Sequence, residues 1–100
     1  MFMNNKFIVF INREFEPVIV LDNVLNHKGI KFPESFGEPS VRCGGGWWDA
    51  RNGVLKLYED SFDFGKYDLE TAEEAFKKHN VFYKDKNVYD EFHLNKINCI

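Results

Sequence analysis

The chain has 100 residues, of which 44% are hydrophobic and 17% aromatic, and its formal net charge is −3. This length fits one domain that buries roughly 60–65% of the surface of its unfolded chain, so the composition argues against a disordered protein. The acidic balance argues against nonspecific binding to a nucleic-acid polymer, which needs a basic surface.

The cysteines and the first residues favour a cytoplasmic protein. Cys43 and Cys99 are too few for a disulfide framework, and there is no pair of CxxC motifs for zinc. The apolar run at residues 7–11 is too short for a signal sequence or a membrane span. We therefore expect no membrane association, no metal site and no cofactor.

The first half of the chain predicts two strands and a short helix. Residues 7–11 and 18–21 are β-branched or aromatic runs joined by a polar connection, so they predict neighbouring buried strands. Apolar residues then follow at mixed spacing, and Gly29 and Pro33 limit any helix near residues 26–36 to about two turns.

The second half predicts a hairpin and an amphipathic helix. Residues 41–48 and 54–59 flank Asn52-Gly53, a pair typical of a two-residue hairpin turn. Residues 68–80 predict a helix capped by Asp68, with one apolar face made of Leu69, Ala72, Ala75 and Phe76. Residues 81–100 contain the run VFY, a turn at KDKN, and a segment that fits either a strand or a helix.

This order of elements predicts one domain, residues 1–100, of the α+β class. We expect a mostly antiparallel or mixed sheet with helices beside it.

Two polar side chains stand where strands are expected to end. His27 follows the second predicted strand, where an imidazole can act as a base, a nucleophile or a phosphate donor, or can be an ordinary loop histidine. Ser61 stands between a strand and a glycine, Gly65, that precedes a helix, so the N–H groups around Ser61, Phe62 and Asp63 can form an anion-binding nest. No GxSxG motif marks Ser61 as a nucleophile.

The sequence GGGWW combines bare backbone with large rings. Gly44, Gly45 and Gly46 do not fit a P-loop, because no GxxxxGK[ST] pattern and no helix follow them. They fit a bulged strand, or a place where a ligand approaches the backbone. Trp47 and Trp48 can stack on a base, or can belong to the core or an interface.

These motifs resemble the Janus/Ocnus group of small phosphohistidine phosphatases. The resemblance implies Lys6 as the strand lysine, His27 as the general base, and Tyr58 to Gly65 as the phosphate-binding strand end. Trp47 stands where that group has an arginine, and YED replaces its Tyr-Gly pair.

The segments PVIVLDNVLNHKGI, FGEPSVRCGGG and NGVLKLYEDSFDFG, with Asp68, also resemble a group of small tailed-phage proteins over about residues 17–76. Some of these resemble sponges that capture the cyclic nucleotides of anti-phage immunity without cleaving them. The resemblance implies a homo-oligomer in the host cytoplasm. It also implies that Trp47 and Trp48 stack on bases while Lys6, His27 and the N–H groups around Ser61 hold phosphates.

Three functions therefore stand open. The first is capture of a phosphorylated small molecule such as a cyclic di- or trinucleotide, without cleavage. The second is a phosphatase that uses His27 as its base. The third is an inhibitor that binds a host protein through its tryptophans and acidic hairpin.

Overall fold

The centre of the computed structural model is an antiparallel hairpin of β1 (Asn5–Asn12) and β2 (Pro17–Asn23), as predicted. The structure describes residues 4–92 and 96–100. Both strands lie in the middle of the sheet, whose order is β6-β5-β2-β1-β3-β4-β7. Their apolar side chains on both faces are buried because other segments cover each face.

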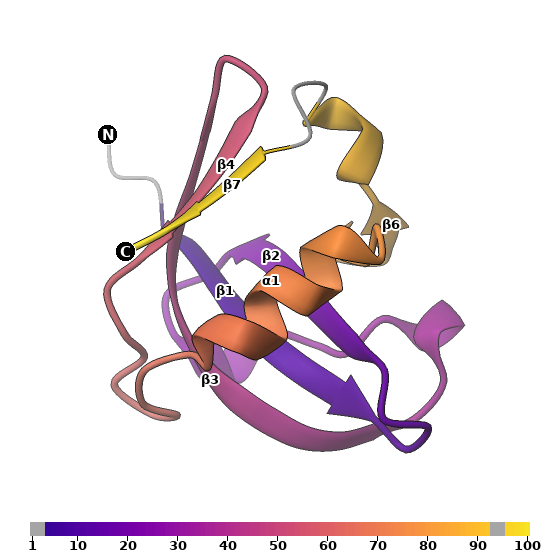
Figure 1. Cartoon of the computed structure of the whole chain (residues 1–100). Coiled ribbons are helices and arrows are strands. Elements are labelled where there is room, and N and C mark those ends of the chain that lie inside the picture. Colours follow the sequence, from indigo (N-terminus) through magenta and orange to yellow (C-terminus); the bar gives the residue numbers. More distant parts are fainter. Residues whose placement is uncertain (1–3, 93–95) are drawn as a thin grey trace.

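The predicted hairpin at Asn52-Gly53 is also present. It joins β3 (Pro39–Arg51) to β4 (Val54–Tyr58), and the φ angles of Asn52 and Gly53 are 54° and 77°, as a type I′ turn requires. The first part of β3 pairs with β1 and its last part pairs with β4. The register of β1 with β3 shifts between Ile8 and Phe10 and again between Ile11 and Asn12, and β3 bends strongly, so the sheet curls (Figure 1).

The predicted helix is α1 (Leu69–Lys77), and Asp68 caps it by accepting a hydrogen bond from the Thr71 N–H at 3.1 Å. The helix ends three residues before the predicted residue 80, since the backbone reaches a left-handed φ of 65° at His79. The short helix predicted near residues 26–36 is replaced by two separate 3-10 turns, η1 (His27–Gly29) and η2 (Glu34–Phe36). Pro33 lies between them in extended backbone.

The C-terminal fifth of the chain adds strands to both edges of the sheet. β5 (Val81–Tyr83) pairs in parallel with β2, and β6 (Lys86–Asn87) pairs with β5 in antiparallel fashion. The 3-10 turn η3 (Tyr89–Glu91) follows, and β7 (Lys96–Cys99) pairs in parallel with β4. The predicted α+β class with a mixed sheet is confirmed, although most of the fold is sheet.

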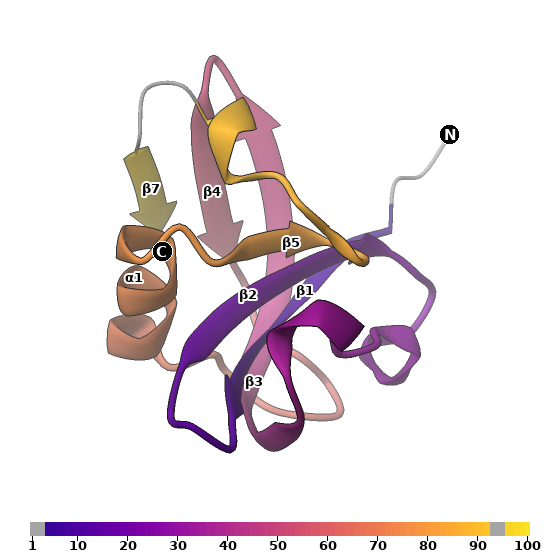
Figure 2. The same ribbon diagram turned by 90° about the vertical axis from the view of Figure 1, so that its right-hand side faces the viewer.

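Each face of the sheet has its own core. Figure 2 shows α1 on one side of β1 and β2, and the η1 and η2 segment on the other. The α1 side buries the larger cluster, which includes Phe7, Ile19, Leu57, Tyr67 and Phe76. The opposite side buries Ile8, Phe10, Val18, Val20, Ile30 and Phe82. No helix within the described ranges is long and apolar enough to cross a membrane.

Candidate functional site

A cavity of about 610 Å³ opens on the face of the sheet that η1 covers. Its walls come from the start of β1, the middle of β3, the segment after β2 and the loop after β4. Six residues that the sequence singled out line it together: Lys6, His27, Trp47, Ser61, Phe62 and Asp63. Leu25, Asn26 and Asp60 complete the lining.

Strand register places Lys6 beside Trp47. Lys6 on β1 is the direct partner of Trp47 on β3, and Trp47 is the direct partner of Tyr58 on β4. Direct partners project from the same face of a sheet. The Lys6 ammonium accordingly lies 4.2 Å from the centroid of the Trp47 ring, a cation–π contact.

The Lys6 ammonium is a buried charge without an ionic partner. The residue is only 9% exposed, and its Nζ donates one hydrogen bond, to the Val24 carbonyl oxygen at 3.3 Å. It forms no ion pair with any carboxylate of the described residues. Buried lysines normally have an anionic partner. Its two remaining N–H bonds make this ammonium the strongest anion-binding group in the cavity.

His27 is fixed against the glycine strand. The residue is 3% exposed, and its Nε2 lies 2.8 Å from the Gly46 carbonyl oxygen. A carbonyl oxygen only accepts hydrogen bonds, so Nε2 carries the proton. Nδ1 has no hydrogen-bond partner among the described residues. Every fully buried polar side-chain atom of those residues does have a partner, so Nδ1 is not fully buried and is open to the cavity that His27 lines.

Burial lowers the pKa of His27 below 6.5. The hydrogen bond to the Gly46 carbonyl opposes this shift, the Lys6 charge adds to it, and the charges of Asp63 and Asp60 oppose it. The imidazole is therefore neutral at pH 7, and Nδ1 offers a lone pair to whatever occupies the cavity.

The loop after β4 is a tight hairpin closed by Ser61 and Gly65. The Ser61 N–H donates to the Gly65 carbonyl at 3.1 Å, and the Gly65 N–H donates back at 2.8 Å. The Ser61 hydroxyl oxygen accepts the Phe64 N–H at 3.0 Å. Ser61 thus shapes the loop, and its own N–H is not free for an anion. The N–H groups of Phe62 and Asp63 have no partner within residues 4–92 and 96–100.

At each of the three glycines, another segment of the chain's own backbone passes too close for a side chain. A Cβ on Gly44 would lie 2.5 Å from the carbonyl carbon of Lys66 and 2.6 Å from the Cα of Tyr67. A Cβ on Gly45 would lie 3.1 Å from Cδ2 of His27 and would overlap with the Phe7 carbonyl oxygen. Gly45 therefore makes room for the imidazole. A Cβ on Gly46 would overlap with the carbonyl oxygen of Tyr58, on the neighbouring strand.

Several residues that the sequence singled out lie outside this cavity. Its lining does not include Gly44, Gly45, Gly46, Trp48, Tyr58 or Gly65. Trp48 projects from the opposite face, where its Nε1 donates to the Asp22 carbonyl oxygen at 3.0 Å. The period of two along a strand separates adjacent tryptophans in this way. This alternation was the signal in the sequence that only one of the two tryptophans, Trp47 or Trp48, can face a given cavity.

The cavity also carries acidic and apolar side chains, of which the sequence singled out Phe62 and Asp63 but not Asp60 or Leu25. Asp60 and Asp63 line it, and Asp63 forms an ion pair with Lys28 at 3.8 Å. Leu25 and Phe62 stand at its rim with 78% and 101% exposure. Leu25 and Asn26 directly precede His27 in the sequence, and this adjacency was the signal that could have placed both residues at the site.

Comparisons with protein families, with curated proteins and with solved structures found no match. Within the described residues, no group of three or more His, Cys, Asp or Glu side chains is arranged to hold a metal ion.

Proposed function

We propose that this protein captures a phosphorylated small molecule with an aromatic base, such as a cyclic di- or trinucleotide, without cleaving it. The observation that carries the proposal is the Lys6 ammonium, buried without a carboxylate partner on the wall of a cavity. An anion from the ligand would supply the missing partner.

The aromatic part of the ligand is argued from Trp47 and Phe62. Both line the cavity, and Phe62 presents its whole ring to solvent. Stacking of a base on such a ring contributes about 1–3 kcal/mol and tolerates every base. Covering Phe62 and Leu25 would also remove exposed apolar surface from water.

The two carboxylates favour a phosphodiester over a phosphate monoester. Asp60 and Asp63 oppose negative charge in the cavity, and this opposition is greater for a dianion than for a group with a single charge. A phosphodiester carries one negative charge, and the amino and hydroxyl groups of a nucleotide can donate hydrogen bonds to the carboxylates. A cyclic dinucleotide meets both conditions.

A second function, hydrolysis with His27 as general base, is favoured by one specific observation. The neutral imidazole has its Nδ1 open to the cavity, as a base that accepts a proton from water needs. Two observations oppose it: the lowered pKa makes His27 a weaker base, and only 3% of the residue's surface is exposed to solvent. We rank it second.

The test is depletion of free ligand. The protein is incubated with a panel of cyclic di- and trinucleotides, and the free ligand is measured by chromatography before and after heat denaturation. We expect depletion and then recovery of unchanged ligand. A new product that His27→Gln no longer forms would establish hydrolysis instead, and no depletion of any member would overturn capture of a cyclic nucleotide.

Matched variants connect the depletion to this cavity. Phe62→Ala should weaken capture by about tenfold or more, the equivalent of one lost stacking contact. Phe15→Ala, which removes a similarly exposed ring at the β1–β2 turn, should leave capture unchanged. Lys6→Gln should abolish capture, with Lys77→Gln on α1 as its control. Equal effects within either pair would refute the assignment.

A further inference from the structure

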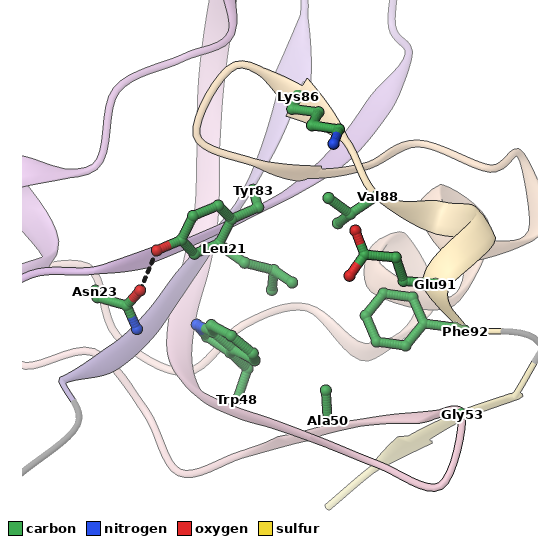
Figure 3. A pocket seen from close by; sticks show the side chains of 10 residues that line it. All are labelled: Leu21, Asn23, Trp48, Ala50, Gly53, Tyr83, Lys86, Val88, Glu91 and Phe92. Carbon is green, nitrogen blue, oxygen red and sulfur yellow. Dashed lines mark hydrogen bonds between the residues drawn. The ribbon is translucent and has the colours of Figure 1, made fainter.

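A second cavity, of about 570 Å³, lies on the opposite face of the sheet (Figure 3). Its walls come from the end of β2, the middle of β3, the β5–β6 hairpin and the segment that carries η3. None of its lining residues lines the first cavity. Its size falls within the range of small-molecule sites, about 300–1,000 Å³.

One wall of this second cavity is a fixed aromatic surface. The Trp48 ring packs edge-on against Tyr83, with 6.2 Å between ring centroids. Hydrogen bonds from the Trp48 Nε1 to the Asp22 carbonyl oxygen and from the Tyr83 hydroxyl to Asn23 hold both rings in place. The polar atoms of both rings are thus already bonded, so their faces offer an apolar surface to a ligand.

Apart from the hydrogen-bonded Tyr83 and Asn23, the polar side chains in the lining of this cavity are those of Lys86 and Glu91. Leu21, Val88 and Phe92 are buried and line it opposite and beside Trp48. Figure 3 shows the Lys86 ammonium and the Glu91 carboxylate at the same end, both directed over the cavity. Neither charge forms an ion pair with a described residue.

We infer that this cavity binds a small aromatic zwitterion, that is, an aromatic ring that carries both a carboxylate and an ammonium group. The ring would lie against Trp48 and Phe92, where it gains aromatic contacts and loses water. The ligand carboxylate would pair with Lys86 and its ammonium with Glu91. A ligand with only one of these charges would leave the other rim charge without a partner.

The test uses three probes that share a phenyl ring and differ only in charge: L-phenylalanine, 2-phenylethylamine and 3-phenylpropionate. The chain has two tryptophans, so in Trp47→Phe the fluorescence of Trp48 alone reports occupancy. Calorimetry with the unmodified protein provides an independent measurement. We expect L-phenylalanine to bind up to about fivefold more tightly than either singly charged probe. Equal affinities, or no binding at millimolar concentrations, would overturn the inference.

Two variants of exposed rim residues assign the charges. Lys86→Gln should lower the affinity for L-phenylalanine to that for 2-phenylethylamine, and should leave the latter unchanged because that probe has no carboxylate. Glu91→Gln should lower it to the affinity for 3-phenylpropionate. Both side chains are exposed, so neither change threatens the fold. If either variant weakens all three probes equally, the charge assignment is wrong.

Discussion

Replacement of Gly44 by alanine should destabilise the fold through a backbone collision. The segment that leads into α1 crosses β3 at this point, where the Asp68 N–H donates to the Cys43 carbonyl at 2.8 Å and the Gly45 N–H donates to the Gly65 carbonyl at 3.1 Å. Gly44 has a φ of +85°, and a Cβ there would lie 2.5 Å from the carbonyl carbon of Lys66. Main-chain atoms cannot rotate away as a side chain can.

Gly65→Ala is the matched control for this substitution. Gly65 has a φ of +79°, close to that of Gly44, but a Cβ there would meet no atom within 4 Å. Its alanine variant carries only the cost of a left-handed residue, about 1 kcal/mol after the gain from a stiffer unfolded chain. Gly44→Ala adds the displacement of a packed segment, about 1–3 kcal/mol, and should therefore lose about 2–4 kcal/mol.

Urea unfolding followed by tryptophan fluorescence measures this difference. For a chain of this size, an extra loss of about 2 kcal/mol moves the urea midpoint by roughly 1–2 M. Equal losses for the two variants would refute the collision. If Gly44→Ala keeps the stability of the Gly65→Ala protein but loses ligand capture, the bare backbone serves a ligand and not the chain.

Two further predictions concern titrating groups. Because burial lowers the pKa of His27 below 6.5, the unfolded chain binds more protons there, so stability is full above pH 6.5 and falls as the pH decreases. Urea midpoints at about pH 7.5 and about pH 5.5 should differ less for His27→Gln than for the unmodified protein, and equal differences would contradict the shift. Burial, and then the charge of Glu73, raise the pKa of the Cys99 thiol to about 11, so it should react with iodoacetamide far more slowly in the folded than in the urea-unfolded protein. Mass spectrometry of the alkylated protein gives both rates, and equal rates would contradict burial of this thiol.

Local signals in the sequence predicted the parts of the fold that depend on neighbouring residues. Asn52-Gly53 fixes its turn because both residues accept positive φ, and Asp68 fixes the start of α1 because its side chain binds the Thr71 N–H. The parallel pairs of β5 with β2 and of β7 with β4 join segments far apart in the chain. No local pattern encodes such pairs, so the sequence left residues 81–100 open.

For the candidate site too, the sequence predicted what local signals encode and missed what depends on distant residues. The sequence singled out His27 and Ser61 from their positions at strand ends and Lys6 from the resemblance to small phosphohistidine phosphatases, and the fold brings all three to one cavity. It did not predict that Ser61 uses its own N–H to close the loop, because the return bond comes from Gly65 across a hairpin. It assigned Asp63 to the site only through its N–H group, and gave no sign that the carboxylates of Asp60 and Asp63 face the cavity, since a loop has no period that assigns a side chain to a face.

The adjacent tryptophans line separate cavities on opposite faces of the sheet. Trp47 projects to the face that holds His27, and Trp48 projects to the face that α1 covers, so each ring is a wall of its own cavity. Trp48 is held by the backbone carbonyl of Asp22, and Lys6 by the backbone carbonyl of Val24. Neither of these two hydrogen bonds involves a side chain of the other cavity. Effects of substitutions in the two cavities should therefore add, since they share no side-chain partner. Binding of a phosphodiester beside Trp47 and of an aromatic zwitterion beside Trp48 can then be measured, and can fail, independently.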